Sequence, residues 1–326
     1  MNTWPTILSA VLAVMAVVAA GLVLRRVNWL TEETDRTMLA IIVRLLMPCL
    51  ILHTTLGNVH LREAQNVFWP PLVGALTVLL GFAVAWLWII FTGRWWGGLE
   101  TPAKRGTFAL TTGLYNYIYI PLPLIALLFP EQREATMGVL FVHNVGVELV
   151  LWTLGILLLS GHLGKGWWKR VINPPGVAVV LAILLNFAGA APYLPAFLLD
   201  AMKMLGNCAI PLALLMVGAM VSDQLRTISW KEGWSVIIGS CLLRLLILPI
   251  LFLALMSCLP VSPELKRVML LQAAMPAAMF SVVIARYYHG DPPTAVRIVA
   301  ATSLLSLLSI PLWLAVGLYV FQQLPK

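Results

Sequence analysis

The chain has 326 residues, of which 61% are hydrophobic and 10% are charged, and its mean hydropathy is +0.94. A chain of this composition has too little polar surface to cover the core of a soluble protein, so it is expected to reside in a bilayer. Its net charge of +8 does not indicate a nucleic-acid partner, because the basic residues are dispersed among short connections instead of gathering in one segment.

Apolar runs long enough to span the hydrocarbon region recur along the whole chain. In the first half they occupy 5–24, 37–57, 67–91, 106–129 and 135–161. The first run follows MNTWP, which lacks a basic n-region, so a retained helix is expected there and not a cleaved signal peptide. In the second half the runs occupy 172–190, 196–221, 233–258, 266–287 and 294–321. We therefore predict an all-α membrane protein with ten transmembrane helices, in a single integral membrane domain over 1–326.

A proline-bearing motif recurs at half the chain length. RLLMP at 44–48 returns as NCAIP at 207–211, which is 163 positions later. The similarity is one of layout, since the identity of the side chains is low. It predicts two five-helix repeats, over 1–161 and 172–326. Five spans per repeat place the second repeat in the opposite membrane orientation, an arrangement found in many secondary transporters.

The basic residues predict the topology. The odd-numbered connections carry thirteen Lys and Arg residues, and the even-numbered ones together with the C-terminus carry six. The positive-inside rule then makes the odd connections cytoplasmic and places both termini outside a plasma or inner membrane. The four cysteines lack the spacing of a zinc site, and no Walker loop, HExxH or dinucleotide motif occurs. No metal, cofactor or enzymatic activity is therefore expected.

Arg44 and Arg244 are the two basic residues that the count of the connections leaves out, and Glu148 is an isolated acid within a span; a charge at the centre of a span disfavours insertion by roughly 2.5 to 3.5 kcal/mol. Arg244 lies near the middle of its span, and two roles stay open: substrate binding, or a structural ion pair or clamp on carbonyls of a neighbouring broken helix. For Arg44, snorkelling to the headgroups is the favoured alternative. Glu148 could carry a proton in an apolar setting or stay ionised beside an arginine. His143 precedes it by five positions and so lies on another face; for His143, as for His53, packing is the ordinary role.

Two spans contain proline well inside the apolar run. They read TTGLYNYIYIPLPL from Thr111 and LQAAMPAAMFS from Leu271. Proline breaks or kinks a helix, and unwound backbone at membrane depth is tolerated only where protein or a water-filled cavity covers it. The two segments occupy equivalent positions in the two halves, which is typical of a transporter binding site, and the N-termini of the second half-helices would attract an anion. The alternative is a pair of kinked helices with ordinary packing.

Several segments resemble the auxin efflux carrier family, which includes plant auxin exporters and bacterial organic-acid permeases. They are RLLMPCLILHTTLG from Arg44, IPLALLMVGAMVS from Ile210, LLRLLILP from Leu242, and LQAAMPAAMFSVVIARYYHGDPPTAVRIVAATSLLSLLSIPLW from Leu271. The resemblance covers nearly the whole chain. It implies a fold like that of the bile acid sodium symporters, with ten helices in a 5+5 inverted repeat and with helices 4 and 9 broken and crossing. It further implies an elevator, in which helices 3 to 5 and 8 to 10 move past a dimerising scaffold.

The resemblance also implies roles for particular residues. Asn116 and Pro121 match the fourth-helix crossover, and Pro276 matches the ninth. Pro48 and His53 are similar to a second-helix motif that faces the substrate from the scaffold. The chain departs from the family at 117–120, where YIYI replaces the usual glycines. The ninth helix carries Gln272 and no acidic residue, so the resemblance does not support sodium coupling.

We therefore predict a secondary active transporter of a small organic anion, a carboxylate, that works as a homodimer without nucleic-acid partners. The predicted substrate-binding residues are Asn116, Pro121, Gln272, Pro276, Arg244, His53 and Arg44. The predicted proton-coupling residues are Glu148 and His143. A membrane-embedded ligand sensor or assembly subunit is the main alternative, and a channel is a third.

Overall fold

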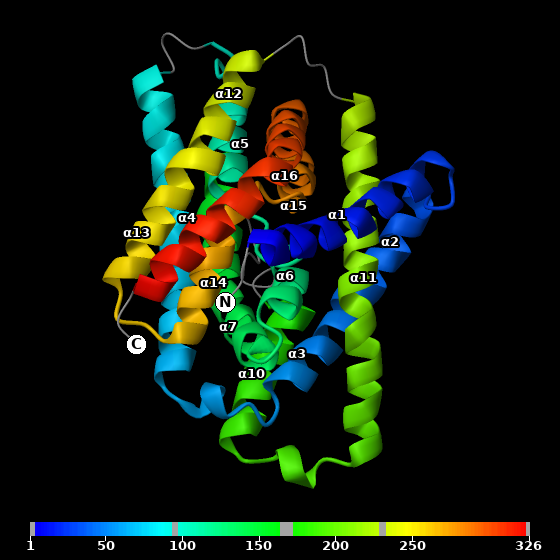
Figure 1. The fold of residues 1–326 in the computed structure, drawn as a ribbon. Coiled ribbons are helices and arrows are strands. Elements are labelled where there is room, and N and C mark those ends of the chain that lie inside the picture. Colours follow the sequence, from blue (N-terminus) through cyan, green and yellow to red (C-terminus); the bar gives the residue numbers. More distant parts are fainter. Residues whose placement is uncertain (1–3, 93–96, 164–171, 228–232, 324–326) are drawn as a thin grey trace.

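The computed structural model describes residues 4–92, 97–163, 172–227 and 233–323. Within these ranges the chain is built from helices (Figure 1). The first half contains α1 (Trp4–Arg26), α2 (Glu32–Ile41), η1 (Ile42–Leu46), α3 (Met47–Thr55), η2 (Val59–Arg62), α4 (Gln65–Thr92), α5 (Pro102–Gly113), α6 (Pro121–Leu128), α7 (Arg133–Val150), η3 (Leu151–Gly155) and α8 (Ile156–Ser160). The second half contains α10 (Pro174–Phe187), η4 (Ala191–Tyr193), α11 (Ala196–Thr227), α12 (Trp234–Leu242), η5 (Leu243–Ile247), α13 (Leu248–Cys258), α14 (Pro263–Ala274), α15 (Phe280–Tyr287) and α16 (Pro292–Gln323).

The predicted all-α membrane architecture is confirmed. Among the described residues, seven helical stretches are long and apolar enough to cross a membrane. The predicted run at 172–190 forms the shorter apolar helix α10. The remaining two runs are interrupted, as the internal prolines predicted: α5 is followed by α6, and α14 by α15, with non-helical backbone between them. The count of ten transmembrane helices stays a prediction.

Both interrupted pairs begin with the same local signal. Thr101 caps α5 by accepting a hydrogen bond from the backbone N–H of Lys104, and Ser262 caps α14 by accepting one from the N–H of Leu265. A proline follows each cap, at the first helical position, where its missing N–H leaves no hydrogen bond unmade. The two half-helices therefore start at positions that are fixed locally by sequence.

Two π-helical segments precede prolines in the membrane-spanning part of the chain. The helix that begins as α12 widens at η5, just before Pro249. Pro249 has no N–H to donate to the carbonyl of Leu245, four residues earlier. The indole Nε1–H of Trp313 donates to that carbonyl instead, at 2.7 Å. The equivalent widening at η1 contains Arg44 and precedes Pro48. Proline therefore reshapes both helices, and α16 supplies the donor missing from one of them.

Helices α1 and α11 cross at close range (Figure 1). Gly218 of α11 lies so near the α1 backbone that a Cβ there would be 1.9 Å from the carbonyl oxygen of Val18. Gly21 of α1 is in the reciprocal position, 2.1 Å from the carbonyl oxygen of Leu215. Small residues that let backbones approach are a main source of helix association in lipid. This pair therefore fixes α1 against α11.

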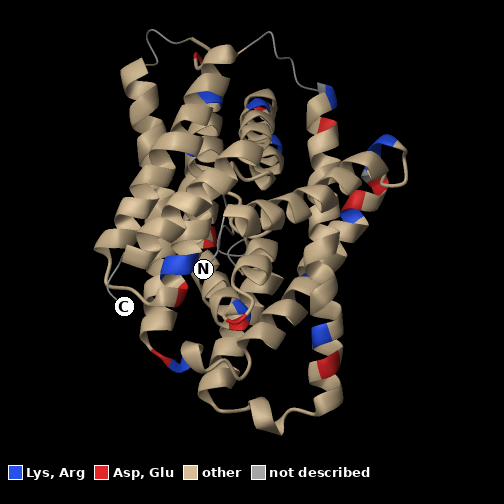
Figure 2. Ribbon diagram, viewed as in Figure 1, with Lys and Arg blue, Asp and Glu red and all other residues tan. Residues whose placement is uncertain are grey.

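Charged residues gather toward the ends of the helices, as Figure 2 shows. Arg25, at the end of α1, is buried and pairs with Asp35 of the next helix and with Asp223 of α11, the latter at 3.2 Å. Three helices are thereby joined at one end of the bundle. Several basic residues that the topology prediction uses lie outside the described residues, namely Arg94, Lys165, Lys169, Arg170, Lys231 and Lys326.

Candidate functional site

The two interruptions meet in the interior of the bundle. The residues between α5 and α6 run antiparallel to those between α14 and α15, with Tyr115 opposite Ala277. The backbone N–H of Asn116 donates to the carbonyl of Pro276 at 2.9 Å, and the N–H of Ala278 donates to the carbonyl of Leu114 at 2.9 Å. Each break thus supplies partners for backbone groups freed by the other, as buried backbone in a membrane requires.

Side-chain amides complete the hydrogen bonding at this crossing. The carbonyl of Tyr117 accepts hydrogen bonds from the amide nitrogens of Asn144 and Gln272, both at 3.1 Å. The side-chain oxygen of Asn116 accepts from the N–H of Tyr119 at 3.1 Å, which shapes the turn leading into α6. The hydroxyl of Thr302 accepts from the N–H of Ala277 at 3.3 Å. The crossing is therefore held by groups from α7, α14 and α16.

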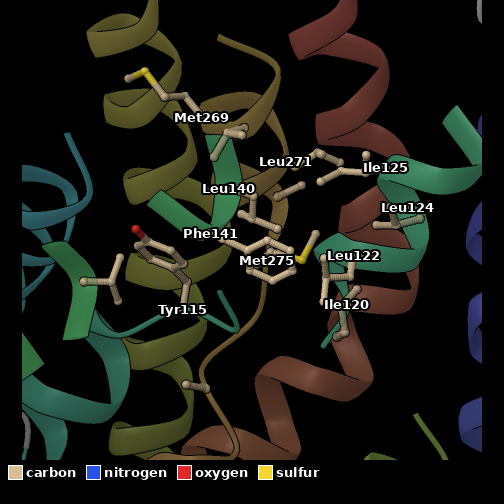
Figure 3. Close-up of a cluster of buried hydrophobic side chains, with 14 of the residues drawn as sticks. Tyr115, Ile120, Leu122, Leu124, Ile125, Leu140, Phe141, Met269, Leu271 and Met275 are labelled. Carbon is tan, nitrogen blue, oxygen red and sulfur yellow. The ribbon is translucent and has the colours of Figure 1, made fainter. Parts of the chain in front are cut away.

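Apolar side chains from both halves of the chain surround the crossing. Figure 3 shows Met275, from the second break, beside Phe141 of α7 and Leu122 of α6. These residues belong to one buried hydrophobic cluster, and Met275 itself is fully buried. Packing of this kind leaves little freedom for the two breaks to separate.

Arg244 lies behind the crossing and is completely buried. Its guanidinium Nη2 reaches the carbonyl of Gln272 in the last turn of α14, at 3.5 Å. The guanidinium carbon lies 5.4 Å from the centre of the Tyr115 ring and 5.3 Å from that of Phe252, within the range of cation–π attraction. The Tyr115 hydroxyl in turn hydrogen-bonds the hydroxyl of Thr77 at 2.8 Å. The contact with the Gln272 carbonyl is the kind expected of a clamp on a broken helix, while Nε and Nη1 are buried without a hydrogen-bond partner among the described residues, so both roles of Arg244 stay open.

A cavity of about 160 Å³ opens on one side of the crossing. Asn116 is a lining residue, and its amide nitrogen Nδ2 is buried and has no hydrogen-bond partner among the described residues. Met279 and Phe280, at the N-terminal end of α15, form another part of the wall. The lining is Val43, Met47, Asn116, Tyr117, Ile118, Tyr119, Glu148, Trp152, Asn173, Pro175, Ala278, Met279 and Phe280. Glu148 is the acidic residue in this lining, and none of the described lining residues is Lys, Arg or His.

Glu148 is joined to α10 across the cavity wall. The side-chain amide nitrogen of Asn173 donates a hydrogen bond to its carboxylate, while the amide oxygen of Asn173 caps α10 by accepting from the N–H of Gly176 at 2.8 Å. Asn173 therefore links the carboxylate of Glu148, on α7, to the start of α10. Asn173 is not among the residues predicted from sequence, although Asn followed by two prolines is a typical helix-start signal.

The other predicted site residues occupy different places. Pro121 begins α6 and Pro276 lies in the second break, so both belong to the crossing. His143 is fully buried, with its Nδ1 3.2 Å from the amide oxygen of Asn144, and does not line the cavity. Arg44 is exposed and His53 is half-buried, and neither lines the cavity, although Val43 does. The structure thus places Asn116 and Glu148 in the cavity lining and the two prolines at the crossing beside it, whereas Arg44, His53, His143 and Arg244 do not line the cavity.

A pair of broken helices crossing inside a multi-pass apolar bundle defines a membrane transporter. Residues 6–166 and 161–314 match the membrane transport protein family, and the chain belongs to this family, that of the auxin efflux carriers.

Relatives from archaea and plants are similar over different lengths. An uncharacterized transporter of Methanothermobacter thermautotrophicus is 26% identical over 93% of this chain and 96% of its own length. An uncharacterized transporter of Methanocaldococcus jannaschii is 25% identical over 94% of this chain and 97% of its own. Auxin efflux carrier component 8 of Arabidopsis thaliana is 26% identical over 50% of this chain and 41% of its own.

Proposed function

We propose that this protein is a secondary active transporter that binds a small organic acid in the cavity at the crossing and carries it with a proton. In this proposal the chain crosses a plasma or inner membrane ten times, as two inverted five-helix repeats with both termini outside. The crossed helices move as an elevator against a dimerising scaffold. The observation that carries the proposal is the cavity itself, because Asn116 and the acidic side chain of Glu148 line it beside two broken helices.

The groups that would receive a carboxylate are on one wall. Asn116 offers its free amide N–H, and the N-terminus of α15 carries the partial positive charge of a helix end. A substrate carboxylate between them would gain a charge-assisted hydrogen bond in a poorly hydrated space, where such bonds are strong. No cationic side chain is needed for this mode of binding.

Glu148 is the group that takes up and releases the proton in this proposal. Two carboxylates in one apolar cavity repel each other unless a proton lies between them. A bound organic acid would therefore favour protonation of Glu148, and the proton would leave when the substrate does. Protonation would also weaken the hydrogen bond from Asn173, since a neutral carboxyl is a poorer acceptor, and so loosen the link between α7 and α10.

Arg244 has a supporting role in this proposal. Its charge is directed at the Gln272 carbonyl and at two aromatic rings on the far side of the crossing. It would hold the broken end of α14 in place while the substrate binds on the opposite face. Gln272 would act in the same way, because its amide nitrogen is already bonded to Tyr117.

The test uses purified protein in liposomes and a panel of radiolabelled carboxylates, with protein-free liposomes as the correction for passive permeation. Wild-type protein is expected to show saturable counterflow and faster uptake under an inward proton gradient. Glu148→Gln should retain counterflow and lose the response to the gradient, because its side chain is permanently neutral. Glu134→Gln is the matched control, since it removes an exposed carboxylate from the first turn of the same helix. An unchanged pH response in Glu148→Gln would rule out the coupling role.

The same measurement separates the rival functions. A ligand sensor or an assembly subunit would bind a carboxylate without exchanging it across the membrane, so counterflow would be absent. A channel would show flux that does not saturate.

A further inference from the structure

We infer that the protein binds one anionic phospholipid at a defined site, with the lipid phosphate at Arg105 and an acyl chain along α4. The site lies where the end of α4, the start of α5 and the end of α8 meet. It shares no described lining residue with the cavity at the crossing, so the inference does not depend on the proposed function.

The headgroup would occupy an open pocket of about 710 Å³. This volume is typical of small-molecule sites, which range from about 300 to 1,000 Å³. Arg105 is the charged residue among the described lining residues, and Ser160 contributes a hydroxyl. That hydroxyl lies 2.9 Å from the carbonyl of Ile156 and 2.7 Å from that of His162, so it already has acceptors. The guanidinium of Arg105 is therefore the group that would bind a ligand.

Arg105 is exposed, and it forms no ion pair with an acid in the part of the chain that the structure describes. Its Nε donates to the carbonyl of Leu99 at 2.8 Å, which orients the guanidinium. Glu100, which is close in sequence, pairs instead with Lys104 at 3.0 Å. The planar fork of an arginine matches a phosphate, and a lipid phosphate would supply the missing negative charge.

An apolar groove continues from this pocket along α4. Its volume is about 320 Å³, and it shares Trp86 and Leu158 with the headgroup pocket. Its described lining residues are all aliphatic or aromatic, and Leu79 and Leu157, on its two sides, are exposed. From Leu79 to Ile90 the helix rises about 16 Å at 1.5 Å per residue. One leaflet of the hydrocarbon core is about 15 Å thick, so pocket and groove together match the length of one lipid.

The depth of the pocket in the membrane also suits a lipid headgroup. Trp86 lines both parts of the site, and tryptophan is enriched at the level of the headgroups. In the topology proposed above, the connections that follow α4 and α8 are cytoplasmic. The cytoplasmic leaflet carries the anionic lipids, and basic pockets between helices on this side bind their headgroups.

The rival occupants are a zwitterionic phospholipid and a soluble phosphate. Charge favours the anionic lipid, because the ammonium of a zwitterionic headgroup would be repelled by Arg105. The groove favours a lipid over a soluble phosphate, since a soluble phosphate has no apolar part to place there.

Native mass spectrometry of the purified chain in detergent measures the binding. Phosphatidylglycerol and phosphatidylcholine with identical dioleoyl chains are added in equal amounts. The wild type is expected to bind phosphatidylglycerol about fivefold more tightly, which corresponds to the contribution of one basic residue at an anionic membrane surface. This preference should decrease as the salt concentration is raised, because the guanidinium is exposed.

Arg105→Gln should remove the preference, since the two lipids differ in the charge of the headgroup. Arg105→Lys keeps the charge without the planar fork, so it should retain most of the preference. Arg26→Gln is the matched control. Arg26 is exposed at the end of α1, on the same predicted side of the membrane, and lines neither the pocket nor the groove.

Ala83→Phe tests the groove separately. Ala83 is exposed and lines the groove but not the headgroup pocket. The larger side chain would fill the space that an acyl chain needs, so both lipids should bind about threefold more weakly with the preference unchanged. Ala20→Phe is the matched control, because Ala20 is exposed on α1 and lines neither part of the site.

The preference between the two lipids decides the inference. It is refuted if Arg105→Gln keeps the wild-type preference, or if Arg105→Lys loses it as fully as Arg105→Gln does. Displacement of phosphatidylglycerol by an equal concentration of glycerol phosphate would make the pocket a site for a soluble anion. If Ala83→Phe converts a dimer to a monomer and leaves lipid binding intact, the groove is an interface with a second copy. If Arg105→Gln does not fold, a wild-type preference that is insensitive to salt is sufficient to refute the inference.

Discussion

Asn116 allows the architecture of the crossing to be separated from substrate recognition. Its side-chain oxygen accepts a hydrogen bond from the Tyr119 N–H, and its side-chain nitrogen is buried without a hydrogen-bond partner among the described residues. Asn116→Ser keeps an acceptor that can reach the Tyr119 N–H but is too short to present a donor to the cavity. Asn116→Ala removes both functions. Comparison of the two variants therefore tests which atom matters for binding.

The magnitudes follow from the two hydrogen bonds. A hydrogen bond to a charged group contributes about 1.5 to 3 kcal/mol, so both variants should bind a carboxylate roughly 10- to 100-fold more weakly. Only Asn116→Ala leaves the part-buried Tyr119 N–H without its partner, which should lower the free energy of unfolding by about 1 kcal/mol.

Affinity is measured by calorimetry and stability by denaturant unfolding of the same preparations, at pH 7.5. Asn116→Ala is expected to have lower affinity and lower stability than the wild type. Asn116→Ser is expected to have lower affinity alone. Wild-type affinity in Asn116→Ser would refute the reasoning, because binding would then depend on the shape of the turn and not on the amide donor.

Two further predictions concern stability. Trp313→Phe should lower the free energy of unfolding by about 1 to 3 kcal/mol, because the carbonyl of Leu245 loses its donor. In a Pro249→Ala background the loss should be smaller, because the N–H of the new alanine can donate to that carbonyl. Equal losses in the two backgrounds of this double-mutant cycle would contradict this account. Gly218→Leu should abolish accumulation of folded protein in the membrane, since its Cβ would clash with the α1 backbone, and normal yield by fluorescence-detected size-exclusion chromatography would show that α1 can move.

Prolines inside apolar runs allowed the breaks at Pro121 and Pro276 to be predicted, because the effect of proline on a helix is local. Asn116 was predicted from its resemblance to the family motif. The pairing of Tyr115 with Ala277 could not be predicted from local sequence, since it joins backbone groups more than 160 residues apart and any residue types could form it. The position of each break is thus a sequence property, whereas their contact is a property of the fold.

For the charged residues, too, local sequence predicts one part and the fold determines the other. Glu148 could be identified as an isolated acid within a span, but its neighbour Asn173 comes from another helix. Arg244 could be identified as a charge near the middle of a span, but its contact with the Gln272 carbonyl depends on where α14 ends. A charge within a span can therefore be recognised in the sequence, but its burial and its partner depend on tertiary structure, since Arg44 is exposed while Arg25 at the end of α1 is buried.

The pairing at the crossing also constrains how the protein is made. When the ribosome has delivered α5 and α6 to the membrane, the N–H of Asn116 and the carbonyl of Leu114 still lack their partners, which lie at 276–278. The backbone groups of the first break must therefore stay hydrated or be held by the insertion machinery while the residues from the end of α6 to 278 are synthesised. Synthesis of the second break would then supply the hydrogen-bond partners that the first break lacks. Final assembly of both halves should therefore be a single late event in biogenesis.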